Sequence, residues 1–135
     1  MKNNPIVFGR MQIAGVVLGI ILAMGFLTLP IGLRSTFAFL ISVIIPSLYV
    51  GSAIQEGSRN GIVIQIFVAV LFLGIACLGM LKCKVFFSIG LFLHGFWDLF
   101  HHTRHAPTPV QRWYPSFCAI VDWTLGTALL FIPLG

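Results

Sequence analysis

Long apolar runs are the feature that most restricts the fold of this chain. A helix that crosses a bilayer needs about 20 mainly apolar residues, because it rises about 1.5 Å per residue through roughly 30 Å of hydrocarbon. Five runs meet this requirement, at about residues 11–33, 36–54, 61–81, 85–102 and 113–134. Only 8% of the residues are charged, whereas a soluble domain carries roughly a quarter. The sequence therefore predicts an all-α fold, a polytopic transmembrane helical bundle of about five spans.

These runs occupy most of the chain, so we expect residues 1–135 to form a single integral membrane domain. We expect the first run to be retained, because it is longer than the apolar part of a secretory signal and lacks a small-x-small cleavage site. Within this run, Gly15, Gly19 and Ala23 recur every four residues. Such a stripe of small residues allows another helix to approach closely.

Basic residues lie near the ends of the runs, which is typical of topology signals and excludes a nucleic-acid-binding patch. With five spans, Lys2, Arg10, Arg59, Arg104 and Arg112 fall on the side of the N-terminus, and Arg34, Lys82 and Lys84 fall on the other. Cytoplasmic loops carry an excess of Lys and Arg. The sequence therefore predicts a cytoplasmic N-terminus and an external C-terminus, with membrane lipids and no nucleic acid as partners.

The acidic residues converge on one end of the predicted bundle. Glu56, Asp98 and Asp122 are the only acids in the chain. The second run closes at Glu56, Asp98 lies about one helical turn before the end of the fourth run, and Asp122 lies about two turns into the fifth. With alternating spans, all three face the same leaflet. Ionisable residues at membrane depth are costly, and they mark a functional site by default.

All four histidines lie at the same level, between residues 94 and 105. On a helix, residues four apart share one face, and this is the spacing of paired ligands in zinc sites. Three pairs have this spacing: His94 with Asp98, Asp98 with His102, and His101 with His105. The pairs overlap, so the spacing does not choose among them.

We predict from these residues a site for a divalent metal ion, zinc or iron, at one membrane face. The candidate ligands are Asp98, His101, His102, His105 and Asp122. Glu56 and His94 are the candidates for acid–base catalysis. In an enzyme, metal-activated water would then act on a lipid-like or other membrane-soluble substrate. The sequence does not decide whether the protein is an enzyme.

The count of ligands excludes several other cofactors. A carboxylate-bridged di-iron bundle takes four acids, more than this chain has. Membrane desaturases and hydroxylases use more histidines than the four present. Cys77, Cys83 and Cys118 show no C-x-x-C spacing, so they define neither a disulfide framework nor a cysteine-only metal site. The sequence also lacks a Gly-rich phosphate loop and a nucleotide-binding fingerprint.

Three alternatives remain open. The histidines and nearby aromatic residues can form a solvated cluster and an aromatic belt at the membrane interface. A proton- or ion-coupled transporter would use Asp98, Asp122 and His94 as a relay. In a non-catalytic assembly partner, the polar stripe would dock a second copy or another membrane subunit through interhelical hydrogen bonds.

A combination of motifs in the last third of the chain resembles a known family. The motifs are His94-x-x-Trp97-Asp98-x-x-His101-His102, then Pro109, Trp113, Tyr114 and Pro115, then Cys118-Ala119-Ile120-x-Asp122. They resemble a family of small bacterial integral membrane proteins known as a domain of unknown function. The resemblance covers roughly the last 45 residues well and the first 80 only by hydropathy. It implies a bacterial inner-membrane location, one site shared by the two segments, and a glutamate that Glu56 fits. It implies no reaction or substrate.

Overall fold

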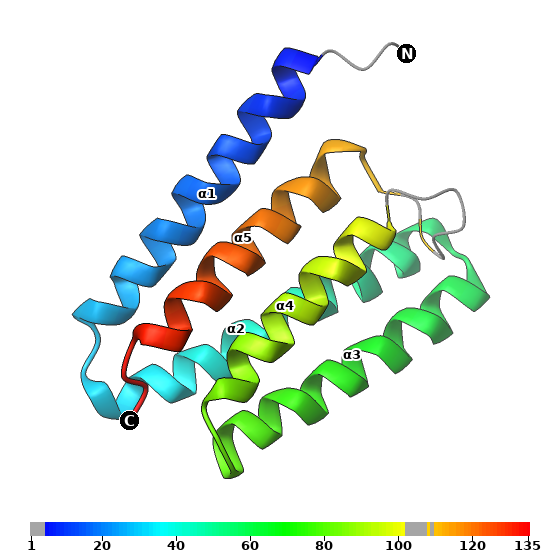
Figure 1. Ribbon diagram of the computed structural model, residues 1–135. Helices are drawn as coiled ribbons and strands as arrows, with labels where there is room; N and C mark the ends of the chain where they lie inside the picture. Colours follow the sequence, from blue (N-terminus) through cyan, green and yellow to red (C-terminus); the bar gives the residue numbers. More distant parts are fainter. Residues whose placement is uncertain (1–4, 102–107, 109) are drawn as a thin grey trace.

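The chain folds into helices joined by short connections (Figure 1). The computed structural model describes residues 5–101, 108 and 110–135, and their side chains from Gly9 onward. The helices are α1 (Pro5–Thr28), α2 (Ile31–Glu56), α3 (Arg59–Leu81), α4 (Val85–Phe100) and α5 (Trp113–Phe131). No strand occurs among these described residues. The predicted all-α fold is confirmed.

Proline and glycine set the first two helix boundaries. Helix α1 ends at Thr28, and α2 begins after Pro30, whereas the first predicted run continued to residue 33. The difference arises because a proline disfavours helical geometry in the residue before it, and Leu33 therefore belongs to the next helix. Helix α2 ends at Gly57, which has a φ of 78°. Glycine adopts this left-handed conformation without the steric cost that other residues incur.

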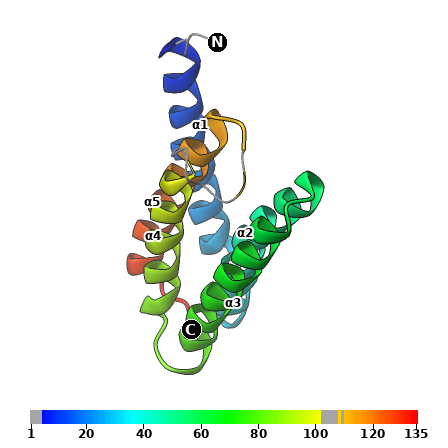
Figure 2. The same cartoon turned by 90° about the vertical axis from the view of Figure 1, so that its right-hand side faces the viewer.

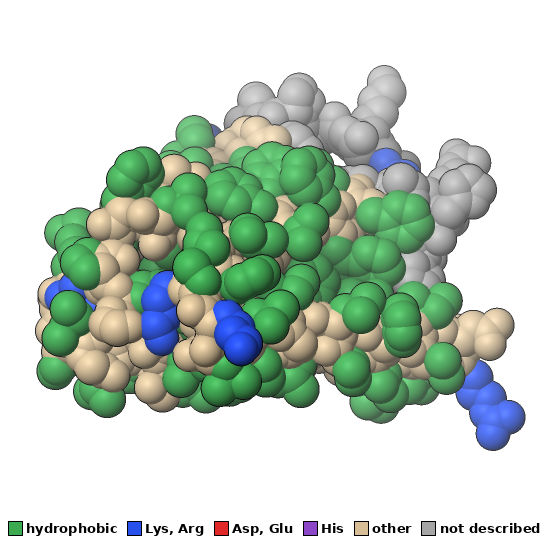
Figure 3. All heavy atoms as spheres, turned by 60° about the horizontal axis from the view of Figure 1, so that its bottom comes forward, with side chains coloured by type: hydrophobic (Ala, Val, Ile, Leu, Met, Phe, Trp, Pro, Cys, Tyr) green, Lys and Arg blue, Asp and Glu red, His purple; other side chains and the backbone are tan. Residues whose placement is uncertain are grey.

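Four of the described helices are long and apolar enough to cross a membrane: α1 from Gly9, α2, α3 and α5. Helix α4 is also apolar but has only 16 residues, which corresponds to about 24 Å. Large hydrophobic side chains are exposed along all five helices. The face in Figure 3 is covered mainly by hydrophobic side chains, and no acid or histidine is visible on its described part. Such an apolar exterior is expected of a membrane protein.

The helices form two groups. Helix α5 packs between α1 and α4, while α2 packs mainly against α3. Figure 2 shows the α2–α3 pair inclined to α4 and α5. Helices α3 and α4 provide most of the contact between the groups, with a smaller contribution from α2 against α4. Successive helices alternate in direction, so that α1 begins at one end of the bundle and the chain finishes at the other (Figure 1).

Small residues bring α1 against α5, as the stripe in the sequence predicted. A Cβ atom on Gly15 would lie 2.9 Å from the carbonyl oxygen of Phe117, and one on Gly19 would lie 2.7 Å from Cβ of Thr124. These distances leave no space for a larger side chain. The apolar core lies toward the opposite end of the bundle from the acidic residues, and includes Phe26, Ala38, Ala76, Phe87, Leu91, Leu125 and Leu129.

Candidate metal centre

His94, Asp98 and Asp122 form a buried cluster between α4 and α5. His94 and Asp98 are four residues apart on α4 and therefore share a face, while Asp122 approaches from α5. The Nδ1–H group of His94 donates to Oδ2 of Asp122 at 2.7 Å, and Nδ1 lies 3.5 Å from Oδ2 of Asp98. The three residues are 2%, 0% and 1% exposed. One ligand atom from each lies within 4.8 Å of the others.

A glycine next to His94 permits this close approach. A Cβ atom on Gly95 would overlap Nε1 of Trp123. The indole N–H group of Trp123 donates to the carbonyl oxygen of Phe92 at 3.2 Å. Trp123, which neighbours Asp122 in sequence, therefore sets the separation of the two helices and contributes no atom to the cluster.

Helix α2 reaches the cluster through Tyr49. The hydroxyl group of Tyr49 donates to Oδ1 of Asp98 at 2.7 Å, and Tyr49 is 2% exposed. Sequence reasoning missed this residue, although the signal was present: the chain has two tyrosines, and Tyr49 lies inside a predicted span. A buried tyrosine hydroxyl group usually finds a hydrogen-bond partner.

His101 belongs to a different polar group. It follows the last residue of α4, and its Nδ1–H group can donate to the carbonyl oxygen of Trp97 at 3.0 Å. In that tautomer Nε2 accepts a hydrogen bond from the side-chain amide of Gln65, whose nitrogen lies 2.9 Å away. The same amide nitrogen donates to the hydroxyl oxygen of Thr108 at 3.3 Å. Both ring nitrogens of His101 are thus engaged outside the cluster.

The other predicted site residues lie elsewhere. Glu56 is the exposed last residue of α2 and lines a surface hollow together with Gln55, Trp113 and Tyr114. His102 and His105 lie outside the described residues. Of the seven predicted site residues, the structure therefore brings together Asp98, Asp122 and His94.

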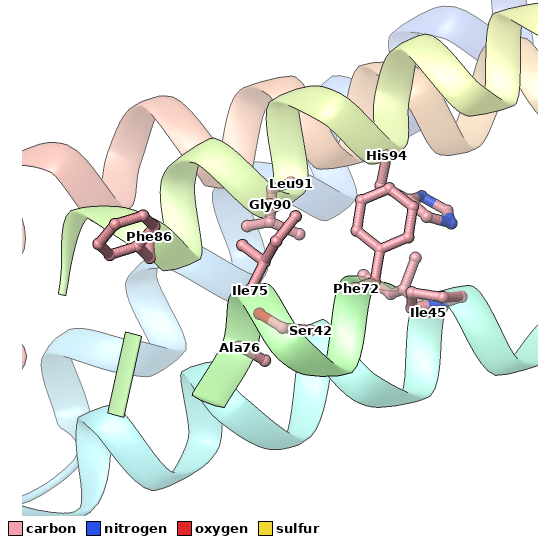
Figure 4. Close-up of a pocket in the computed structure, with 10 residues that line it drawn as sticks. Ser42, Ile45, Phe72, Ile75, Ala76, Phe86, Gly90, Leu91 and His94 are labelled. Carbon is pink, nitrogen blue, oxygen red and sulfur yellow. The ribbon is translucent and has the colours of Figure 1, made fainter. Parts of the chain in front are cut away.

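Two polar atoms of the cluster have no hydrogen-bond partner in the described part of the chain. They are Oδ2 of Asp98 and Nε2 of His94. His94 lies beside a small cavity between α4 and the α2–α3 pair, and the ring of Phe72 lies edge-on to its imidazole with centroids 5.1 Å apart (Figure 4). The cavity is lined mainly by apolar side chains, so it offers Nε2 few partners.

The charges of the cluster do not balance. It contains two carboxyl groups and one imidazole, and within the described residues no Lys or Arg forms an ion pair with either acid. If both acids are ionised, the net charge is −1 with a charged imidazole and −2 with a neutral one. Burying uncompensated charge is costly, especially at membrane depth. A proton on one acid beside a charged imidazole, or a divalent cation beside a neutral one, would bring the net charge to zero.

Comparison with known proteins gives a family and no activity. Residues 10–133 match the model of a family of unknown function, DUF6010. No curated protein and no solved structure matches the chain. The match agrees with the resemblance to an uncharacterised family and extends over nearly the whole chain.

Proposed function

Because the chain belongs to the DUF6010 family, whose function is unknown, we propose a function from the buried cluster alone. The protein is a membrane protein that binds one divalent metal ion through His94, Asp98 and Asp122. The observation that carries this proposal is the convergence of these three residues, from two helices, on one buried point. A neutral imidazole, two carboxylates and a divalent cation together have no net charge, so the buried site would hold no uncompensated charge.

The spacing of the cluster suits a metal ion after a small adjustment. Two ligands that each lie about 2.1 Å from a tetrahedral zinc ion are about 3.4 Å apart. Nδ1 of His94 lies 3.5 Å from Oδ2 of Asp98 and 2.7 Å from Oδ2 of Asp122. The first distance fits, and the second needs to widen by less than 1 Å once Nδ1 loses its proton.

Three protein ligands leave a position free for water or substrate, as in catalytic zinc sites. A nitrogen and two oxygens also suit iron. A metal ion with an open position would activate water for attack on a membrane-soluble substrate.

The proposal is tested by the metal content of the full chain purified in detergent, measured by elemental mass spectrometry. We expect about one zinc or iron ion per chain. His94→Asn, Asp98→Asn and Asp122→Asn should each lower the content by more than about tenfold, because each removes a direct ligand.

Two variants serve as matched controls. His101→Asn removes a histidine that bonds outside the cluster, and Glu56→Gln removes the acid at the surface. Glu56→Gln should keep the wild-type metal content, and His101→Asn, which leaves all three proposed ligands in place, should lose far less metal than His94→Asn. Loss of metal in His101→Asn with retention in His94→Asn would contradict the proposed ligand set, and metal-free wild-type protein would contradict the function.

A proton relay is the second candidate, and a specific observation favours it. Tyr49, Asp98, His94 and Asp122 form a continuous chain of polar contacts across three helices. In this case a proton on one acid, instead of a metal ion, compensates the buried charge. Metal-free protein in proteoliposomes would then carry pH-driven flux, and Asp122→Asn would abolish it.

A further inference from the structure

We infer that Tyr49 is a positioning residue for the metal centre, a role that rests on the proposed function. Its hydroxyl group holds Oδ1 of Asp98 and so leaves Oδ2 directed toward His94 for the metal ion. Tyr49 is not itself a ligand. It acts through Asp98, as hydrogen-bonded partners of metal ligands commonly do.

The carboxylate geometry supports this division of roles. Oδ1 of Asp98 accepts the Tyr49 hydroxyl hydrogen at 2.7 Å. Oδ2 has no hydrogen-bond partner among the described residues, and it lies 3.5 Å from Nδ1 of His94. Both Asp98 and Tyr49 are buried. A short hydrogen bond away from water limits rotation of the carboxylate, so its free oxygen stays on the side of His94 and Asp122.

Neighbouring rings fix the position of Tyr49. Its ring stacks on His101 with centroids 4.1 Å apart, lies edge-on to Tyr114 at 6.1 Å, and lies 6.0 Å from His94. A tyrosine side chain turns about only two bonds before its ring, and these contacts restrict both. His101, predicted as a ligand, thus supports the centre indirectly by packing against Tyr49.

Tyr49 also makes the cluster depend on α2. Within the described chain, it provides the hydrogen bond that joins the α2–α3 pair to the three proposed ligands. Helix α2 makes few other contacts with α4. Metal affinity is therefore expected to depend on a residue that lies on neither ligand-bearing helix.

The test is a titration of Co²⁺ into the metal-free full chain in detergent, followed by visible absorption. Tyr49→Phe should weaken the Kd for Co²⁺ by about 10–100-fold, the usual effect of losing such a partner. Tyr114→Phe is the matched control, because it removes the hydroxyl group of a tyrosine that touches Tyr49 and forms no hydrogen bond with Asp98. Its Kd should stay near the wild-type value.

A second measurement uses the wild-type protein and does not depend on a variant that folds. A metal ion on Asp98 draws charge from Oδ1 and weakens the Tyr49 hydrogen bond, so Co²⁺ should produce a tyrosine difference spectrum in the near ultraviolet. Tyr114→Phe should retain this signal, and Tyr49→Phe should lose it.

The outcomes separate the two proposals. Equal Kd values in wild type and Tyr49→Phe would overturn the role of Tyr49 and leave the metal centre intact. Metal binding without a tyrosine difference spectrum would also overturn the role of Tyr49 and leave the metal centre intact. Wild-type protein that binds no Co²⁺ would overturn the metal centre, and the positioning role with it.

Discussion

Gly95 controls the spacing of the cluster at the scale of single residues. It lies beside His94 on the face of α4 that meets Trp123, and a Cβ atom there would overlap the indole nitrogen. That nitrogen is held by its hydrogen bond to Phe92, so the ring cannot simply rotate away without losing the bond. An added methyl group would instead push α5 and Asp122 away from α4.

We therefore expect Gly95→Ala to destabilise the protein by about 1–3 kcal/mol, the usual cost of overpacking. It should also weaken metal binding, because Asp122 moves away from His94. Gly74→Ala is the control, since a Cβ atom at Gly74 meets nothing within 4 Å. Thermal unfolding and Co²⁺ titration in detergent measure both effects. Equal behaviour of the two variants would show that α4 and α5 tolerate the added group.

The sequence named all three residues of the cluster together in the relay alternative, whereas the predicted set of metal ligands held Asp98 and Asp122 without His94. Asp98 and Asp122 were predicted to share a site, and the structure brings them together with His94, which was predicted as a catalytic residue. His101 was predicted as a ligand because a helix that continues past residue 100 would place it on the same face as His105. Helix α4 ends at Phe100. Nε2 of His101 is hydrogen-bonded to the side-chain amide of Gln65, a residue distant in sequence. Spacing within one helix could not reveal that partner.

At the scale of elements, α1 is separate from the cluster. It packs on α5 through Gly15 and Gly19, and none of the three proposed ligands lies on it. Its close packing relies on the small-residue stripe. Helix α1 should therefore contribute to the stability of the fold and little to the metal site.

Gly19→Ala tests this separation. The added Cβ atom would lie 2.7 Å from Cβ of Thr124, so the variant should lower the thermal unfolding temperature while keeping the wild-type metal content. Gly25→Ala, also on α1, is the control because a Cβ atom there meets nothing within 4 Å. Alanine is favoured over glycine in an exposed helix by about 1 kcal/mol, so this control should be at least as stable as wild type. Loss of metal in Gly19→Ala would contradict the separation.

Hydropathy predicted the number of helices better than their ends. The five apolar runs correspond to α1 through α5, because a long apolar run has few alternatives to a helix in a membrane. The boundary between the first two helices lies at Pro30 and not at residue 33 as predicted. A single proline ends the helix locally, and hydropathy averaged over a long run does not detect it. The inclination of the α2–α3 pair (Figure 2) depends on side-chain packing between helices distant in sequence, which apolar runs alone do not encode.

At the scale of the whole molecule, the alternating helices place the start of α1 and the end of the chain at opposite ends of the bundle (Figure 1). Helix α4 is short for a span, at 16 residues. If it crosses with the other four, the termini lie on opposite sides of the membrane. The predicted excess of basic residues on the N-terminal side then favours a cytoplasmic N-terminus.

Reporter fusions that are active in only one compartment test this orientation in bacterial cells. A reporter at the N-terminus should be active in the cytoplasm, and one at the C-terminus should be active outside. A reporter inserted beside Cys83, between α3 and α4, should behave like the C-terminal one. If the two termini report the same side while the Cys83 reporter stays external, α4 does not cross the membrane.

The distribution of the cluster over α4 and α5 has a consequence for biosynthesis. His94 and Asp98 leave the ribosome before Asp122, so α4 reaches the insertion machinery without the carboxyl group that contacts His94 in the folded protein. Ionisable side chains at membrane depth oppose partitioning into lipid. Helix α4 should then wait beside the translocation channel until α5 emerges, and the two should enter the bilayer as a hairpin. A nascent chain halted before Asp122 would leave α4 open to membrane proteases.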